Sequence, residues 1–391
     1  MRFAATFFVV ATALGCAGGG GARGADGGTE SESVGSEDDT ADTIDPTMFS
    51  TSATTNPTTT TGPEATVDET GSDSSSDATS SSGDGPTVVG VTPADDATGI
   101  AADAPVLVGF SAVMDPSTIT ADTGDCTGTI QLSTDDFANC LPLEAKVDAL
   151  RGDTSFRVHA QDGFASVETI AVRVTTDARG ADGSPLAAGF TSGGFTSRYF
   201  HTIEIDGVDD WNGDEGLATS TEGHVAHVAW DETHVYVGVR SPDVAIASGS
   251  VWFVVYFGGD GGNSDGVLYN TQQPALPFDG RWHLRWRADN IYTEVLEYDG
   301  DAWSPGGWMI GDGDVYLNGD LLEMRVARSD LGDPDVLDMH LGIVREAMLD
   351  EASWAACPDT SYADGYDPDY AAYWSFDLRG SDAPGDHAPL P

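Results

Sequence analysis

The strongest constraint on the fold is a pair of β-type segments between residues 225 and 240. Val235, Val237 and Val239 alternate with Tyr, Gly and Arg, which is the period-2 pattern of a strand with one buried face. The segment 225–230 precedes this strand, and the polar residues 231–233 between them are typical of a tight turn. We therefore expect an antiparallel hairpin at the start of a β domain.

Residues 200–391 are expected to form that domain, because they hold all nine tryptophans. Residues 251–257 are apolar on both faces, as in the central strand of a sheet. Asp299-Gly300-Asp301 and Asn318-Gly319 each indicate a hairpin turn. A short amphipathic helix is expected only near residues 345–355. The pattern predicts an all-β fold with a sandwich of jelly-roll size.

The chain is strongly acidic, with a net charge of −49 from 65 acidic and 16 basic residues. Binding to nucleic acid requires the opposite charge, so nucleic acid is excluded as a partner. The acidity is typical of a solvated surface, and it would also attract Ca²⁺.

Residues 1–16 have the pattern of a signal peptide, in which Arg2 precedes an apolar run too short to span a membrane. Ala13-Leu14-Gly15-Cys16 resembles the lipobox of bacterial lipoproteins. The resemblance implies that Cys16 is lipidated and that the exported protein is anchored through lipid at the outer membrane or cell surface. The alternative is an ordinary signal peptide with an incidental cysteine. Residues 17–86, rich in Ser, Thr, Gly and Asp, are expected to be a disordered linker.

Residues 87–199 are expected to form a small, separate sandwich, because short β-type runs at 88–91, 105–110 and 170–174 are separated by Pro, Gly and Asp. The stretch 91–119 resembles the opening of the bacterial Ig-like domains of S-layer and cell-surface proteins. Phe110-Ser111 and Met114-Asp115 are its most specific part. The resemblance implies a spacer without chemistry of its own.

The cysteines of an exported protein are expected to form disulfides where they lie close together. Cys126 and Cys140 belong to the small sandwich, and a bond between them would close a short loop, with a stabilisation of about 3 kcal/mol on the chain-entropy model. Cys357 is then either a free thiol or an intermolecular link.

Three segments of the larger domain resemble family 9 carbohydrate-binding modules and the related DOMON-like sandwiches: residues 203–211 (IEIDGVDDW), 227–241 (HVAWDETHVYVGVRS) and 323–332 (EMRVARSDLG). The resemblance implies a β-sandwich that binds sugar ends between tryptophans and often holds structural Ca²⁺. No sugar-clamping tryptophan or calcium ligand of the family can be matched residue by residue. The acidic residue often found in the central strand is missing from residues 251–257.

Trp303 and Trp308 flank Pro305 and two glycines, which indicates an irregular, exposed segment. An exposed indole ring can stack on the C–H face of a sugar, so these two residues are the candidate ligand platform. The alternative is that both rings belong to the core, as we expect for Trp282 and Trp286.

Arg285 and Arg287 belong to a basic strand face within residues 281–287, which is unusual in so acidic a chain. Each guanidinium group can donate two parallel N–H hydrogen bonds, either to a carboxylate of a ligand or to the hydroxyls of a sugar. The alternative is that acids of a neighbouring strand, such as Glu294 and Glu297, neutralise this face.

Asp260, Asn263 and Asp265 form a Gly-rich acidic turn, and their oxygen atoms are of the kind that bind Ca²⁺. The alternative is an ordinary turn, since Asp, Asn and Gly are common turn residues. Structural Ca²⁺ is the one cofactor that the sequence suggests.

No catalytic site is predicted. His224 and His227 are three residues apart on an expected strand, so their side chains would point to opposite faces and could not bind one metal ion. The sequence also contains no phosphate-binding loop or zinc spacing. We therefore expect a non-catalytic surface lipoprotein whose larger β domain binds a glycan or a surface protein. The alternative is a purely structural envelope component with no small-molecule ligand.

Overall fold

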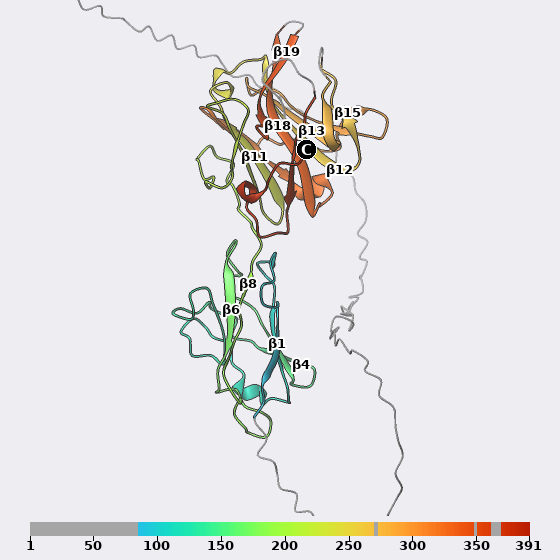
Figure 1. Cartoon of the computed structure of the whole chain (residues 1–391). Helices are drawn as coiled ribbons and strands as arrows, with labels where there is room; N and C mark the ends of the chain where they lie inside the picture. Colours follow the sequence, from blue (N-terminus) through green and yellow to red (C-terminus); the bar gives the residue numbers. More distant parts are fainter. Residues whose placement is uncertain (1–84, 270–272, 348–349, 361–368) are drawn as a thin grey trace, which may run out of the picture. The chain divides into compact units, whose positions relative to one another are not determined.

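The computed structural model describes residues 85–269, 273–347, 350–360 and 369–391 (Figure 1). In these ranges the regular structure consists of β-strands and short 3₁₀ helices, which confirms the all-β prediction. No helix in this described part is long and apolar enough to cross a membrane. The predicted signal peptide with Cys16, and the predicted linker up to residue 84, lie outside the described residues. Pro86, at the end of the predicted linker, is buried, and its carbonyl accepts a hydrogen bond from the Ala187 N–H at 2.9 Å.

Residues 88–196 form a small sandwich of two antiparallel sheets, with strand orders β1-β2-β5-β4 and β3-β6-β7, in which β8 also pairs with β6. The strands are β1 Val88–Thr92, β2 Val106–Phe110, β3 Ile130–Ser133, β4 Asp148–Leu150, β5 Ser155–Val158, β6 Thr169–Val174, β7 Phe190–Thr191 and β8 Phe195–Thr196. Strands β1, β2 and β6 correspond to the three runs predicted from the sequence.

The core of the small sandwich explains the two most specific residue pairs of its opening stretch. Phe110 packs edge-to-face on Phe156 with 5.8 Å between ring centroids, and Met114 is fully buried. Asp115 follows at the start of the 3₁₀ helix η1 (Pro116–Thr118), where its carboxylate accepts a hydrogen bond from the Ser117 N–H at 2.9 Å. In this stretch Phe110 and Met114 therefore belong to the core, and Asp115 caps the helix that follows.

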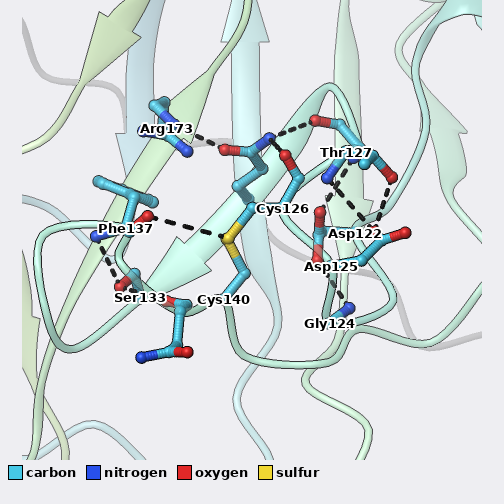
Figure 2. Close-up of a disulfide and its surroundings, with 12 residues drawn as sticks. Asp122, Gly124, Asp125, Cys126, Thr127, Ser133, Phe137, Cys140 and Arg173 are labelled. Carbon is cyan, nitrogen blue, oxygen red and sulfur yellow. Dashed lines mark hydrogen bonds between the residues drawn. A yellow bond between two sulfur atoms is a disulfide. The ribbon is translucent and has the colours of Figure 1, made fainter.

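A disulfide joins Cys126 to Cys140, as the sequence predicts, with 5.4 Å between their Cα atoms (Figure 2). Beside it, the buried carboxylate of Asp122 accepts hydrogen bonds from the N–H groups of Gly124 at 2.7 Å and Gly128 at 2.9 Å. Burial opposes the ionisation of Asp122, but these backbone donors outweigh it and lower the pKa of the carboxyl group. The loop is thus held by one covalent and several polar contacts.

The larger domain is a sandwich of a five-stranded and a seven-stranded sheet. The five-stranded sheet has the order β16-β17-β11-β10-β9, and the seven-stranded sheet has the order β15-β14-β13-β12-β18-β19, with β20 paired to β18. The strands are β9 Gly216–Ala218, β10 Val225–Trp230, β11 His234–Arg240, β12 Val251–Asp265, β13 Ala275–Arg287, β14 Thr293–Tyr298, β15 Trp303–Pro305, β16 Val315–Asn318, β17 Leu321–Ala327, β18 Val336–Ala347, β19 Asp350–Cys357 and β20 Trp374–Asp377. Three 3₁₀ helices accompany them: η2 Val244–Ile246, η3 Arg328–Leu331 and η4 Pro384–Asp386.

The predicted hairpins are confirmed. Strands β10 and β11 pair from Val225↔Arg240 to Trp230↔Val235, and the Asp231 carboxylate accepts hydrogen bonds from the N–H groups of Thr233 and His234 in the turn. Strands β16 and β17 meet at Asn318-Gly319, and β14 and β15 meet at the turn 299–301. These turns are local, so their residues alone indicate them.

The main core lies between the two sheets, and β12 supplies its centre. Val251, Phe253, Val255 and Phe257 of β12 face this core, together with fully buried Trp286, as predicted for a central strand. Cys357 also lies in this core as a free thiol, and the Trp374 indole N–H donates a hydrogen bond to its sulfur at 3.2 Å. Burial raises the pKa of the Cys357 thiol to about 12, so this thiol is unreactive.

The expectation of a helix near residues 345–355 is wrong. Residues up to Ala347 belong to β18 and residues from Asp350 belong to β19, and the two strands pair at Val344↔Ser353 and Glu346↔Glu351. Strand β18 also pairs with the central strand β12, at Val251↔Arg345 among other positions. Pairing between distant segments therefore overrides the local helix preference of this stretch.

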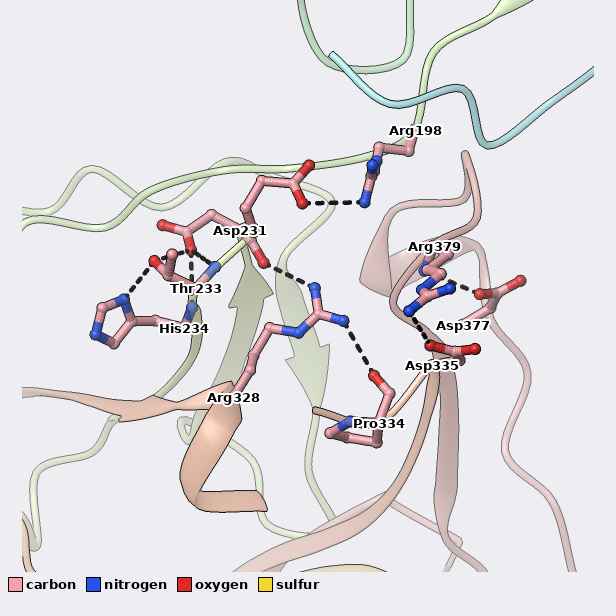
Figure 3. Close-up of polar contacts among 10 residues, drawn as sticks. Arg198, Asp231, Thr233, His234, Arg328, Pro334, Asp335, Asp377 and Arg379 are labelled. Carbon is pink, nitrogen blue, oxygen red and sulfur yellow. Dashed lines mark hydrogen bonds and ion pairs between the residues drawn. The ribbon is translucent and has the colours of Figure 1, made fainter. Parts of the chain in front are cut away.

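Arg328, the first residue of η3, connects the β10–β11 turn to the segment that leads into β18 (Figure 3). It is 6% exposed and donates hydrogen bonds to the carbonyls of Asp231 at 3.1 Å and Pro334 at 3.0 Å. Burial lowers the pKa of its guanidinium. Nearby, Arg379 pairs with the Asp335 carboxylate at 2.7 Å. These contacts position the start of β18 in the seven-stranded sheet.

Candidate functional site

The outer face of the seven-stranded sheet carries a second apolar cluster. Trp252, Val254 and Tyr256 of β12 alternate with the residues of the main core and therefore lie on this outer face. The segment that follows β12, which includes Val267 and Tyr269, packs over these three side chains. The sheet is thus buried on both sides at β12, and a cavity opens at the border of the covering segment.

This cavity, which we call the Trp303 cavity, has a volume of about 630 Å³. It lies where the end of β12, the segment after it and strands β13 to β15 meet. Its aromatic and polar lining consists of Asn263, Asp265, Gln273, Arg285, Tyr298, Asp301 and Trp303. Four of the residues predicted from the sequence, namely Trp303, Arg285, Asn263 and Asp265, are therefore brought together here.

Trp303 is half-buried at one wall of the Trp303 cavity. Its indole N–H donates a hydrogen bond to the carbonyl of Asp265 at 2.9 Å. Its ring meets Tyr298 edge-to-face at 5.8 Å and Tyr256 at 6.1 Å between centroids. The contacts hold the ring in one orientation while leaving part of it accessible, which is the arrangement of a preorganised stacking surface.

Arg285 is held on the opposite side of its strand from the main core. Its Nε donates to the Glu294 carboxylate at 2.8 Å, and a second guanidinium nitrogen also bonds to Glu294. The guanidinium lies 5.6 Å from the Trp252 ring centroid and 5.9 Å from that of Tyr269. Arg285 therefore reaches the Trp303 cavity as one half of an ion pair.

A histidine and two tyrosines form the buried floor beside the Trp303 cavity. The Tyr269 hydroxyl and His283 Nε2 lie 2.7 Å apart, and the His283 ring lies 4.2 Å from the Tyr256 ring. His283 is fully buried, and burial together with the Arg285 charge moves its pKa well below the usual range. His283 is therefore neutral and serves as a hydrogen-bonded structural group.

Trp308 does not join Trp303. It packs, partly buried, against the main core between the sheets, whereas Trp303 packs against the cluster on the outer face. Within the part of the chain that the structure describes, the buried Trp308 indole nitrogen has no hydrogen-bond partner. The two tryptophans therefore do not form a shared platform.

Arg287 also lies apart from the lining of the Trp303 cavity. Its Nε pairs with the Asp289 carboxylate at 2.9 Å, and its guanidinium lies over the rings of Trp252 and Tyr292 at 5.4 and 5.5 Å. Arg281 of the same strand pairs with Glu297 at 2.6 Å. The basic face is thus neutralised by neighbouring acids, including both glutamates named as the alternative.

The three acidic-turn residues are divided between two cavities. Asn263 and Asp265 line the Trp303 cavity, whereas Asp260 lines a separate cavity of about 710 Å³ beside Trp282, Arg281 and Tyr373. Strand β12 continues to Asp265 and pairs with β13, so the turn does not close around one point. Among the described residues, no group of three His, Cys, Asp or Glu side chains is arranged to hold a metal ion.

The two histidines of the 224–227 segment have separate environments. His224 Nε2 lies 3.0 Å from the Asp243 carboxylate, and the His227 ring packs at a tilt beside Trp211 with 5.0 Å between ring centroids. Burial lowers the pKa of His227 to about 4. The pair does not converge, in agreement with the strand geometry expected from the sequence.

Sequence reasoning missed Tyr298, Asp301 and Gln273 as parts of the Trp303 cavity. Tyr298 precedes, and Asp301 belongs to, a hairpin turn that the sequence does indicate, and the β14–β15 pairing places Tyr298 opposite Trp303. If the strand register had been derived from that turn, it would have predicted that Tyr298 and Asp301 lie next to Trp303. Gln273 follows a connection between strands, and no sequence pattern marks it.

Comparison with known proteins identifies one part of the chain. Residues 82–199 match the family of bacterial Ig-like domains, which agrees with the resemblance seen in the opening stretch. No curated protein matches the chain.

Solved structures give weak likenesses. The N-terminal part of the bacterial S-layer protein SbsC is 15% identical, with 55% of this chain and 44% of that one covered and a TM-score of 0.23. A longer SbsC structure, residues 31–844, is 10% identical, with 66% and 39% covered and a TM-score of 0.22. Native alpha-2-macroglobulin from Escherichia coli, domains MG0-NIE-MG1, is 9% identical, with 79% and 97% covered and a TM-score of 0.23. This chain spans less than half of either S-layer structure, and likenesses at these TM-scores carry no argument about its fold or function.

Proposed function

We propose that the bacterial Ig-like domain at residues 82–199 is a spacer in an exported surface protein, which carries a glycan-binding sandwich at residues 200–391. In this proposal lipid at Cys16 anchors the chain to the outer membrane or cell surface, and residues 17–84 supply the linker. The protein is non-catalytic. The family match supports the spacer, and the signal-like residues 1–16 support export.

The observation that carries glycan binding is the lining of the Trp303 cavity. An immobilised, half-buried indole ring lies beside a second aromatic ring, two amide side chains and two carboxylates. Sugars present an apolar C–H face and a rim of hydroxyls, so they are recognised by a stacking ring surrounded by hydrogen-bonding groups. The volume of about 630 Å³ lies within the ordinary range of small-molecule sites.

A purely structural envelope component is the second candidate function. The observation that favours it is the neutralisation of the basic face, since Arg281, Arg285 and Arg287 each pair with a carboxylate of this chain. Such pairs neutralise the basic face without a ligand. In this reading the Trp303 cavity holds only water.

A glycan array separates the two candidates. The probe is the Cys16→Ser chain, in which the thiol that would carry lipid is absent, applied to neutral, amino and acidic oligosaccharides. Binding to at least one class is the expected result. No binding to any class, with the chain shown to be folded by circular dichroism, would leave the structural function as the better account.

A further inference from the structure

The charge of the Trp303 cavity restricts the class of sugar that it can accept. Asp265, Asp301 and Arg285 are the charged groups of its lining. The Arg285 guanidinium is paired with the Glu294 carboxylate. The charged groups that remain for a ligand are therefore the carboxylates of Asp265 and Asp301. The charge that a ligand meets is therefore negative, although a strand face rich in arginine borders the cavity.

Arg285 is poorly placed to bind a ligand carboxylate. Two of its nitrogens bond to the Glu294 carboxylate, and the aromatic rings of Trp252, Tyr269 and Tyr292 surround it within 5.9 Å. A ligand anion would have to displace Glu294 and leave that glutamate unpaired beside it. Loss of one partner from a partly buried pair is costly, so exchange is unfavourable.

Asp265 and Asp301, in contrast, are exposed and available. Within the ranges that the structure describes, neither carboxylate takes part in an ion pair or accepts a side-chain hydrogen bond. They lie on the two segments that flank Trp303: the Asp265 carbonyl accepts the Trp303 indole N–H, and Asp301 precedes β15 in the turn. A cationic group on a sugar ring stacked on Trp303 would therefore enter a cavity in which, among the described residues, the charges without an ion-pair partner are these two carboxylates.

We propose that the Trp303 cavity selects sugars that carry a free ammonium group, as in glucosamine, over their N-acetylated forms, and discriminates against uronic acids. The inference rests on the proposed function. The sugar ring stacks on Trp303, the hydroxyls bond to the Asn263 amide and to the amide oxygen of Gln273, whose nitrogen already donates to the Gly266 carbonyl at 3.1 Å, and the ammonium group lies near the two carboxylates. A uronate in the same position places its carboxylate against like charges.

The test compares short oligomers of glucosamine, N-acetylglucosamine and galacturonic acid of equal length. Affinities for the Cys16→Ser chain are measured by calorimetry at a mildly acidic pH that keeps the glucosamine amine protonated. The whole chain is acidic, so a control for general attraction is needed. Asp265→Asn with Asp301→Asn removes two charges from the cavity, and Asp103→Asn with Asp312→Asn removes two exposed charges elsewhere.

The glucosamine oligomer is expected to bind about 3–10-fold more tightly than the N-acetylated one, in keeping with one or two partly exposed charge pairs. The cavity double variant should lose this preference, and the control double variant should keep it. The inference would be overturned if the galacturonic acid oligomer bound as tightly as the glucosamine oligomer. It would also be overturned if both double variants lost the preference for the glucosamine oligomer equally. In either case the protein would still bind glycans. If none of the three oligomers binds, the inference is overturned, and the glycan array decides separately whether the proposed function stands.

Discussion

Trp303 and Trp308 show at the residue scale how far a sequence pattern reaches. Both lie in a Gly- and Pro-containing stretch, and both were expected on one exposed surface. The β14–β15 register, with Tyr298 opposite Trp303 and Leu296 opposite Pro305, places the Trp303 ring on the outer face. Trp308 lies past the end of β15, where the chain returns toward the main core. The local composition identifies Trp303 and Trp308 as candidate binding residues, but the strand pairing determines on which face of the sheet each ring lies.

The two tryptophans are expected to differ in their contribution to stability. Trp308→Ala removes a ring that packs against the main core and should lower the free energy of unfolding by about 2–4 kcal/mol, somewhat less than for a fully buried aromatic residue. Trp303→Ala should cost less, because its ring borders a cavity. Urea unfolding measures both, with the fully buried Trp286→Ala as the upper reference. A larger loss for Trp303→Ala than for Trp308→Ala would contradict the assignment of faces.

Buried histidines are expected to make the protein sensitive to acid. Burial lowers the pKa of His227 to about 4 and of His340 to about 3, whereas both have a value near 6.5 in the unfolded chain. The unfolded state therefore binds more protons between these limits. The histidine contribution to stability is complete above pH 6.5 and is lost as the pH falls toward 4 and 3.

His227→Leu tests this dependence, since it removes the titrating ring beside Trp211 and keeps an apolar side chain. The slope of the unfolding free energy against pH is proportional to the number of protons taken up on unfolding. In the variant this number should be smaller by up to one between pH 6.5 and 4. Unfolding curves of the variant and the parent that fall in parallel over this range would contradict a neutral buried His227.

At the scale of elements, the sequence predicts what is local and misses what depends on pairing. The β10–β11 hairpin and the central part of β12 follow from alternation and from an apolar run. The hairpin of β18 and β19 was missed, because a helix was expected near residues 345–355, where strands form only through pairing of β18 with β12 and with β19. The Trp303 cavity depends on the same kind of information, since β12, β13, β14 and β15 must be aligned before its residues meet.

The β16–β17 turn gives a test at this scale. Gly319 has φ +62°, a left-handed conformation that a side chain disfavours. Gly319→Ala should therefore lower stability by about 1 kcal/mol, although nothing lies within 4 Å of the added carbon. Gly313→Ala is the matched control, since this glycine is equally open and does not have a positive φ. Equal urea midpoints for both variants would show that backbone strain is not the cause.

At the scale of the whole molecule, the sequence indicates the parts and their order better than the purpose of any part. Composition separates the leader, the linker and the two sandwiches, and the family match agrees with the first sandwich. The acidic composition disfavours nucleic acid as a partner but does not identify a ligand. Ligand chemistry depends on which charges remain unpaired, and that is visible only once Arg285 is seen bonded to Glu294.

The proposed lipid anchor is tested on the whole chain. Because Cys16 follows the apolar run of the leader, Cys16→Ser should release the protein from membranes and abolish labelling by a fatty-acid analogue. Membrane fractionation with metabolic labelling makes the comparison, and Cys357→Ser is the control, since that thiol is buried in the core of the larger domain. Unchanged fractionation of the Cys16 variant would rule out the lipid anchor.

The central claim is that the Trp303 cavity binds a sugar, and calorimetric titration of Trp303→Ala tests it most directly. The ligand is the oligosaccharide that the Cys16→Ser chain retains most strongly on the array, and Tyr316→Ala, which removes a 47% exposed ring from β16 of the other sheet, is the control. Loss of the stacking ring should weaken binding by at least about tenfold, as for a typical hot-spot residue, and the control should bind like the parent. Unchanged affinity in Trp303→Ala, with the variant shown to be folded, would contradict the claim.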